Sequence, residues 1–266
     1  MPGTPHCQYP TVTVVGPQYQ QTSAPGLRTD VGATMTIATR QPLLLTLGVI
    51  CALVAWSSFG SSVAAEPAGP LPKATLDLPV GAGAQSVVLA GGCFWCVEAV
   101  FEQFVGVTSV VAGYAGGTAE TATYERYHES DHAEVVKITY DPARISYGDL
   151  LRVLFTAGDP TTKDGQRPDY GRQYRMAIFT ADDAQKQVAE AYLAQVTAAK
   201  LYDQPLQVTV EPLGRGFFPA EDYHQHYVTQ NPSKGYVQQW SLPKIALVRA
   251  TFPELVKPAQ ETPPNR

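Results

Sequence analysis

The residues best suited to chemistry are two cysteines with two aromatic residues between them, in the segment Cys93-Phe94-Trp95-Cys96. A β-rich run and a Gly-Gly pair precede this segment and a helical pattern follows it, so we expect Cys93 at the first turn of a helix. The free N–H groups of a first turn favour an anion, and they can lower the pKa of a thiol and make it a better nucleophile. Two thiols at i and i+3 can also form a disulfide, so that one could resolve the oxidised form of the other.

The pair has plainer interpretations too. It could be an inert structural disulfide, or half of a zinc site that is completed by histidines from the set His128, His132, His224 and His226. Phe94 and Trp95 could be core residues, or they could line an apolar slot for a thioether-like group, because sulfur packs well against aromatic rings. The residue types alone leave these alternatives open.

Composition argues against some classes of function. The 266 residues are 44% hydrophobic and 16% charged, as in an ordinary globular protein, and the formal net charge is −5. No long basic run occurs in the sequence, which argues against nucleic acid as a partner. Of the four cysteines, Cys7 and Cys51 lie in a leader-like region, and so few cysteines do not make a disulfide scaffold of this size.

Residues 1–65 are expected to be a leader. An uncharged apolar run at 43–56 has the length of a signal-peptide core rather than of a membrane span, and Ala65 ends an A-x-A-like cleavage site. Translation from Met35 would give a compact signal. We therefore expect export to the periplasm or to the outside of the cell, with an uncleaved membrane anchor as the alternative. Residues 66–85 are rich in Pro, Gly and Ala and are expected to be a linker.

The pattern along residues 86–240 predicts one domain, followed by a C-terminal tail over 241–266. Strands are expected at 86–90, 107–114, 133–140, 174–180 and 206–213. Helices are expected from the Cys93 region to Gly106, from a Ser146 cap to Ala157, from a Thr180–Asp183 capping box to about 200, and briefly at 220–227. Because several strands are not separated by helices, we expect an α+β two-layer sandwich, a mixed sheet with helices packed on it, with a ferredoxin-like core.

Over about residues 87–252 the chain resembles the A-type peptide methionine sulfoxide reductases. The segment GGCFWCVEAVF (91–101) is similar to the active-site motif of that family. Further matching segments occur in the expected order: GYAGG (113–117), TYE (123–125), HAEVVKITYDP (132–142), ISYGDLL (145–151), DPT (159–161), QYR (173–175) and PAEDYHQHY (219–227). The resemblance implies an enzyme that reduces methionine-S-sulfoxide, peptide-bound or free, to methionine and so repairs oxidised proteins.

The resemblance also implies a role for each matching residue at the reacting atoms. Cys93 would attack the sulfoxide sulfur and be left as a sulfenic acid, and Glu134 would supply a proton to the sulfoxide oxygen. Tyr124 and Tyr174 would donate hydrogen bonds to the same oxygen. Because that oxygen is a poor leaving group, it must be protonated as sulfur is attacked, and a buried carboxyl with a raised pKa suits this task.

Three further residues would bind the substrate. Phe94 and Trp95 would hold its S-methyl group, and Asp169 would contact its backbone. The family often carries resolving cysteines near the C-terminus, whereas this chain has none after Cys96. Cys96 is therefore the expected partner of Cys93 in a disulfide intermediate, with direct reduction of the sulfenic acid by an external thiol as the alternative.

The expected partners follow from this chemistry. We expect a monomeric protein that acts on oxidised proteins or free methionine sulfoxide and is itself reduced by a thioredoxin-like protein. We expect no metal and no organic cofactor. Two competing functions are a general thiol–disulfide oxidoreductase that uses the Cys93–Cys96 pair, and a non-catalytic binder of oxidised proteins. The first would not need Glu134, and the second would show no turnover.

Overall fold

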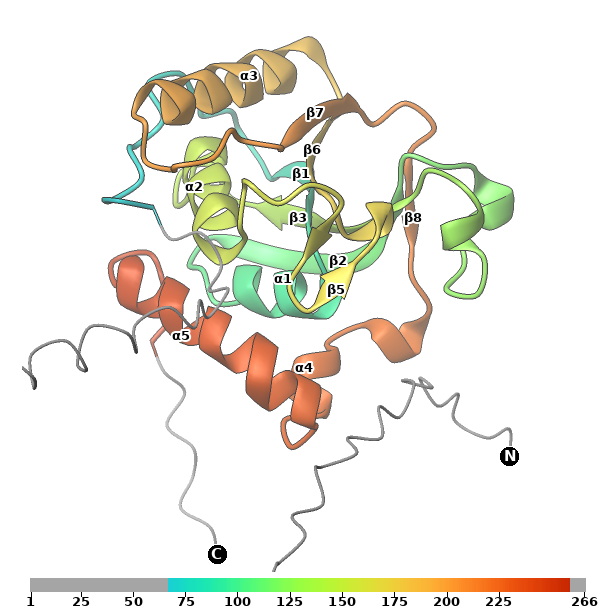
Figure 1. Ribbon diagram of the computed structural model, residues 1–266. Coiled ribbons are helices and arrows are strands. Elements are labelled where there is room, and N and C mark those ends of the chain that lie inside the picture. Colours follow the sequence, from blue (N-terminus) through green and yellow to red (C-terminus); the bar gives the residue numbers. More distant parts are fainter. Residues whose placement is uncertain (1–66, 259–266) are drawn as a thin grey trace, which may run out of the picture. The chain divides into compact units, whose positions relative to one another are not determined.

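The structure, a computed structural model, describes residues 67–258 (Figure 1). The leader predicted at 1–65 and its apolar run lie outside these residues, and within them no helix is both long and apolar enough to cross a membrane. The principal elements are β1 (Gln85–Gly91), α1 (Phe94–Phe101), β2 (Val107–Ala115), β3 (Ala133–Tyr140), α2 (Tyr147–Ala157), β6 (Met176–Thr180), α3 (Asp183–Ala198), β7 (Thr209–Pro212), β8 (Phe217–Pro219), α4 (Tyr227–Gln230) and α5 (Leu242–Thr251). A small hairpin, β4 (Gly165–Gln166) and β5 (Asp169–Tyr170), lies in the loop after α2.

Six strands form one sheet in the order β7-β6-β1-β3-β2-β8. All neighbours are antiparallel except β6 and β7, which run parallel, so the sheet is mixed. The prediction of an α+β fold with helices on a mixed sheet is confirmed. The bounds of four predicted strands are right to within two residues, whereas the strand predicted at 206–213 is shorter and spans Thr209–Pro212.

Alternating residues of the strands divide the buried side chains into two layers. Val87 and Leu89 of β1 face the larger core, which is filled by α1, α2 and α3. Val88 and Ala90 face the opposite side, where they join a smaller cluster that includes Phe179. Glu134 follows the same alternation as Val136, and therefore points into the helix layer.

Capping explains where two of the helices begin. The Ser146 hydroxyl accepts a hydrogen bond from the N–H of Asp149, as predicted for the start of α2. The cap predicted at Thr180 for α3 is wrong, because the Asp182 carboxylate accepts the N–H of Gln185 instead. Thr180 is still part of β6, so its backbone is committed to the sheet.

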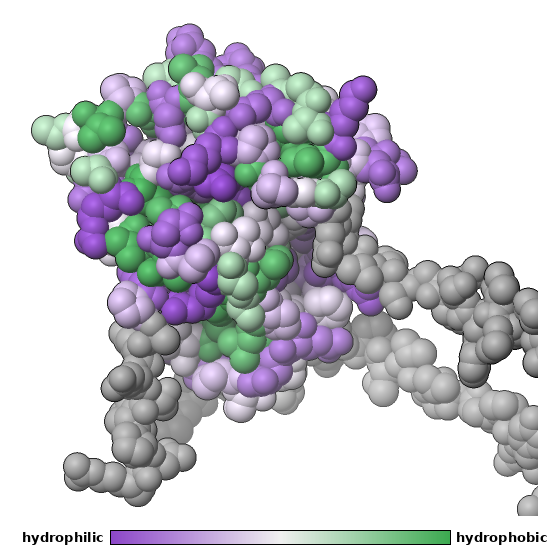
Figure 2. Space-filling model, turned by 90° about the vertical axis from the view of Figure 1, so that its left-hand side faces the viewer, coloured by the Kyte–Doolittle hydropathy of each residue, from purple (hydrophilic) through white to green (hydrophobic). Residues whose placement is uncertain are grey.

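The two segments predicted to be a linker and a tail both contact the domain. Leu71 is buried in the larger core, and both oxygens of Asp77 lie 3.0 Å from the N–H of Gly148 at the start of α2. At the other end, residues 242–251 form α5, and Phe252 is 1% exposed. The predicted helix at 220–227 is instead a short turn at Asp222–His224 followed by α4. On the face shown in Figure 2, hydrophobic and hydrophilic side chains are interspersed.

Candidate active site

A glycine turn between β1 and α1 places the first cysteine. Gly92 has a φ of +92°, which is a conformation that favours glycine, and a Cβ at this position would lie 2.6 Å from Cβ of Gln166. Cys93 therefore occupies the N-cap of α1, and its carbonyl accepts the N–H groups of Cys96 and Val97 at 3.1 and 3.2 Å. The predicted position of Cys93 at the start of a helix is confirmed.

Glu134 lies against the same helix end. Its Oε2 accepts the N–H of Phe94 at 2.9 Å, and its Oε1 accepts the hydroxyl of Tyr127 at 3.1 Å. The side chain is only 2% exposed, and burial raises the pKa of Glu134 to about 8. The two hydrogen bonds lower this pKa, but burial outweighs them. A carboxyl with this pKa is mostly protonated at neutral pH and can act as an acid.

The two cysteines are buried, reduced and hydrogen-bonded to each other. Burial raises the pKa of the Cys93 thiol well above its usual value, and the nearby Cys96, Glu134 and Asp169 act in the same direction. The expectation that the helix N-terminus would lower the pKa of Cys93 is wrong for this state, because desolvation and neighbouring acidic groups outweigh the helix field.

Cys96 has the opposite shift. The hydrogen bond from Cys93 lowers the pKa of Cys96 to about 6, assisted by the positive charge of Lys244 and by Ser241. The Cys96 sulfur lies 3.1 Å from the Ser241 hydroxyl and 3.9 Å from the hydroxyl of Tyr236. The pair thus holds its proton on Cys93 and its negative charge on Cys96 near neutral pH.

The two aromatic residues between the cysteines have different surroundings. Phe94 is 1% exposed and packs in the core, with its ring centroid 5.0 Å from that of His224. Trp95 is half-buried, stacks on Tyr227 at 3.8 Å and donates its indole N–H to His224 Nδ1 at 3.1 Å. Phe94 is therefore a core residue that also borders the site, whereas Trp95 remains partly exposed to solvent.

Of the two tyrosines predicted at the site, Tyr174 lies with its hydroxyl 3.4 Å from that of Tyr127. Tyr124 stacks on Tyr127 at 5.7 Å and packs against His224 at 4.4 Å. The hydroxyl that donates to Glu134 is that of Tyr127, a residue that the sequence interpretation missed. Its signal was available, since Tyr127 lies three residues after Tyr124, between the predicted strands at 107–114 and 133–140.

Asp169 lies in the β4–β5 hairpin, close enough to Cys93 to affect its pKa. Its Oδ2 accepts the Tyr236 hydroxyl at 2.5 Å, and burial raises the pKa of Asp169. The predicted residues Cys93, Cys96, Glu134, Tyr174 and Asp169 are thus brought together from four separate segments. Tyr236, Ser241 and Lys244, which join them from the predicted tail and the residues just before it, carried no pattern that single-sequence inspection would detect.

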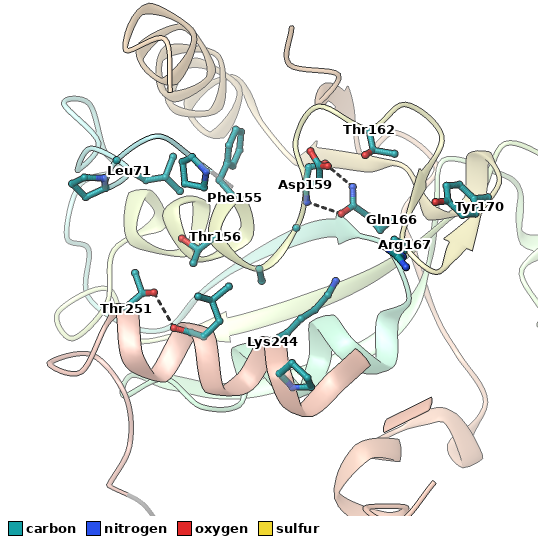
Figure 3. Close-up of a pocket in the computed structure, with 17 residues that line it drawn as sticks. Leu71, Phe155, Thr156, Asp159, Thr162, Gln166, Arg167, Tyr170, Lys244 and Thr251 are labelled. Carbon is teal, nitrogen blue, oxygen red and sulfur yellow. Dashed lines mark hydrogen bonds between the residues drawn. The ribbon is translucent and has the colours of Figure 1, made fainter. Parts of the chain in front are cut away.

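A cavity of about 510 Å³ lies between residues 67–71, α2, α5 and the loop after α2, and its lining includes none of these five predicted residues (Figure 3). Gln166 braces that loop, because its amide accepts the N–H of Asp159 and donates to the Asp159 carbonyl, each at 2.7 Å. Lys244 lines this cavity and also a smaller one that it shares with Cys96. The two cavities also share Ala157 and Gly158, so the larger cavity adjoins the smaller one that Cys96 lines.

Comparison with known proteins identifies the family. A family model described as peptide methionine sulfoxide reductase matches residues 85–255. The chain belongs to this family. The match extends past the predicted domain end at 240 and includes α5 of this reductase.

Curated relatives and a solved structure support the same family assignment. The reductase is 44% identical over 183 residues to peptide methionine sulfoxide reductase MsrA 2 of Mesorhizobium japonicum, covering 68% of this chain and 93% of that protein. It is 45% identical over 175 residues to MsrA of Chromobacterium violaceum, covering 65% of this chain and 99% of that protein. Reduced Mxr1 from Saccharomyces cerevisiae superposes with a TM-score of 0.53 at 30% identity, covering 62% of this chain and 94% of that one. The reductase function implied by the sequence resemblance is confirmed.

Proposed function

We propose that Cys93 attacks the sulfur of methionine-S-sulfoxide while Glu134 donates a proton to the sulfoxide oxygen. The observation that carries this assignment is the position of Glu134. Its buried carboxyl is held by the Phe94 N–H, immediately after Cys93, and its pKa is raised to about 8. A neutral carboxyl beside the nucleophile supplies the proton that makes the oxygen a better leaving group.

Cys96 accepts the proton that Cys93 loses during the attack. The lowered pKa of Cys96 and its hydrogen bond with Cys93 support this transfer. The attack forms the bond from sulfur to Cys93 Sγ, moves one proton from Cys93 to Cys96 and one from Glu134 to oxygen, and leaves Glu134 as the anion. Transfer of the hydroxyl to Cys93 then releases methionine and leaves Cys93 as a sulfenic acid.

Resolution follows at the same pair of residues. Cys96 attacks the Cys93 sulfur, the disulfide forms, and the departing hydroxyl takes the thiol proton of Cys96 and leaves as water. Two thiols that are already hydrogen-bonded need little movement for this step. Glu134 regains its proton from solvent once the site opens.

The walls of the site select the substrate. We assign Phe94 and Trp95 to the S-methyl group, because an aromatic surface favours a methyl next to sulfur. Tyr174 and Tyr124 donate to the oxygen, whereas the hydroxyl of Tyr127 donates to Glu134. Asp169, fixed by Tyr236, contacts the backbone of a peptide-bound methionine sulfoxide.

A thioredoxin-like protein is the proposed reductant of the Cys93–Cys96 disulfide. The cavity lined by Lys244 supports an approach of the reductant from the side of Cys96, since Lys244 also lines the smaller cavity that Cys96 borders. The net charge of −5 supports the exclusion of nucleic acid, and a single chain that carries every residue of the site supports a monomer as the active unit. The chemistry uses thiols and a carboxyl and calls for no resident metal or organic cofactor.

Two proposals concern the rest of the chain. Residues 1–65 are proposed to direct export before cleavage after Ala65, on the basis of the apolar run at 43–56, with a membrane anchor as the alternative. A ferredoxin-like core is supported by the succession β1-α1-β2-β3-α2-β6, whose strands lie in the order β6-β1-β3-β2.

The decisive experiment replaces Glu134 by Gln in the full chain. Methionine production from a peptide with the S-sulfoxide and from one with the R-sulfoxide is measured with dithiothreitol, next to disulfide exchange with a small disulfide. We expect activity for the S form, and a loss of about 10²–10⁴-fold in kcat/KM in E134Q, with disulfide exchange nearly unchanged. The matched control is E98Q, because Glu98 is equally buried but does not contact Cys93 in the described structure. Parental sulfoxide reduction in E134Q would refute the acid role and favour a general thiol–disulfide oxidoreductase.

A further inference from the structure

A second cluster of ionisable side chains lies on α1 apart from the catalytic residues. Glu98 and Glu102 are four residues apart, so their carboxylates project from the same face of the helix end. His226, the residue before α4, lies over them. Its Nδ1 is 2.5 Å from Glu102 Oε1 and 3.9 Å from Glu98 Oε1, and one donor atom of each residue lies within 4.8 Å of the other two.

Glu98 distinguishes this cluster from an ordinary surface ion pair. Its side chain is 1% exposed, and its Oε2 accepts the N–H of His226 at 2.8 Å. Its Oε1 is buried and has no hydrogen-bond partner among the described residues, although it faces the other two donor atoms. Burial of a carboxylate oxygen without a partner costs free energy, so a group that satisfies Oε1 would stabilise the fold.

We propose that Glu98 Oε1, Glu102 Oε1 and His226 Nδ1 bind a divalent cation of the zinc type. One imidazole nitrogen and two carboxylate oxygens form a donor set that zinc accepts, and sites with three protein ligands keep a position for water. Glu102 is 24% exposed and His226 is 56% exposed, so the cation can enter from solvent, whereas Glu98 supplies the buried side.

The cation would join two segments that border the active site. Glu98 and Glu102 belong to the helix that begins at Cys93, and His226 follows His224, which accepts the indole N–H of Trp95. A bound cation would therefore fix the segment that holds His224 against Trp95 to the helix that carries both Trp95 and the nucleophile. The site itself contains neither cysteine and takes no part in sulfur chemistry.

Thermal unfolding with and without Zn²⁺ tests the proposal. The full chain is used with all four cysteines replaced by serine, because thiolates bind Zn²⁺ themselves. At about 100 times the dissociation constant, we expect Zn²⁺ to raise Tm by roughly 5–10 °C. Isothermal titration should give one high-affinity Zn²⁺ ion that is absent or at least about tenfold weaker in H226Q and in E102Q.

The variants are chosen at exposed ligands so that a failure to fold does not confuse the test. E102Q and H226Q alter partly or largely exposed residues, whereas E98Q would alter a buried one. The controls, E190Q and H128Q, remove an exposed glutamate and an exposed histidine elsewhere. The proposal is supported if Zn²⁺ shifts the Tm of the controls as it does that of the parent, but not of E102Q or H226Q. It is overturned if Zn²⁺ shifts none of the proteins, or shifts E102Q and H226Q as much as the parent. In that case the Glu98 oxygen is simply protonated in the resting protein.

Discussion

The hydroxyl of Tyr127 donates a 3.1 Å hydrogen bond to Oε1 of Glu134, while the other carboxylate oxygen accepts the N–H that follows Cys93. The acid is thereby held between the nucleophile and a tyrosine that is itself 5% exposed. A hydrogen bond from Tyr127 to the ionised carboxylate also stabilises the form of Glu134 that exists after proton transfer. This contact makes Tyr127 a positioning residue for the acid.

Replacement of Tyr127 by Phe should lower kcat/KM for the sulfoxide by about 10-fold or more, since it removes a buried hydrogen bond to a group whose charge develops in the reaction. It should also raise the pKa of Glu134 further, because one stabilising donor is lost. Y124F serves as the comparison, measured by steady-state kinetics over a range of pH. An alkaline pKa in the pH profile that is identical in parent and Y127F would contradict the positioning role.

The pH profile of kcat/KM should have two limbs. Glu134 has a pKa raised to about 8 and must be protonated, so activity should fall as pH rises through about 8. Cys96 has a pKa lowered to about 6 and must be ionised to accept the proton of Cys93, so activity should also fall as pH drops through about 6. Rates that keep rising between pH 7 and 9 would instead indicate that ionisation of Cys93 by bulk base limits the reaction.

Lys244 should control the acidic limb. Its positive charge lowers the pKa of Cys96, so K244M should move the acidic limb of the profile toward higher pH and leave the alkaline limb in place. K186M, which removes an exposed lysine on α3, is the matched control. Single-turnover measurements with S-sulfoxide peptide between pH 5 and 7 would show the shift. Equal acidic limbs in all three proteins would argue against Cys96 as the acceptor of the proton.

Glu134 should also make the stability of the domain depend on pH. Its pKa is about 8 in the folded chain and near 4.5 when unfolded, so the folded state holds a proton that the unfolded state releases between these values. The free energy of unfolding should therefore decline as pH rises from about 4.5 to 8, by an amount on the order of a few kcal/mol. E134Q should show a clearly shallower decline in urea unfolding measured at pH 5, 6, 7 and 8. A parallel decline in the two proteins would mean that other groups account for it.

The predicted tail should prove to be part of the domain. Phe252 is 1% exposed and packs on Phe104 with ring centroids 6.0 Å apart, so F252A should cost about 3–5 kcal/mol of unfolding free energy. L247A, in α5 just before Phe252 but 49% exposed, should cost far less. Chemical unfolding of both variants measures these losses of unfolding free energy. Nearly equal losses in F252A and L247A would show that α5 is not packed as described.

Local patterns were enough to locate the thiol nucleophile. The glycine turn before Cys93, the Ser146 cap and the strand over 133–140 are dictated by neighbouring residues, and each was predicted. The buried position of Glu134 on that strand was implied by the family resemblance alone. The resemblance to a known family then connected them to sulfoxide chemistry. These features depend on backbone conformation and on the period of side chains, which a sequence displays directly.

The features that the sequence did not predict depend on packing between residues far apart in the chain. The pKa of Cys93 depends on burial and on Glu134 and Asp169, which lie 41 and 76 positions away, and a helix N-terminus by itself would have predicted the opposite shift. Lys244 lies in the segment that was predicted to be a C-terminal tail, yet α5 brings it beside Cys96. Such contacts arise from tertiary structure and leave no periodic trace in the chain.

The most direct test of the mechanism is a single-turnover experiment without reductant. One equivalent of S-sulfoxide peptide is mixed with the parent, C93S or C96S, and both the methionine formed and the free thiols remaining are counted. We predict that the parent forms one methionine per chain and loses the thiols of Cys93 and Cys96, and that C93S forms no methionine. We predict that C96S also forms one methionine and retains a trappable sulfenic acid at Cys93. Methionine should form more slowly in C96S, because Cys96 no longer accepts the proton. Methionine formed by C93S at the parental rate would contradict the assignment of Cys93 as the nucleophile.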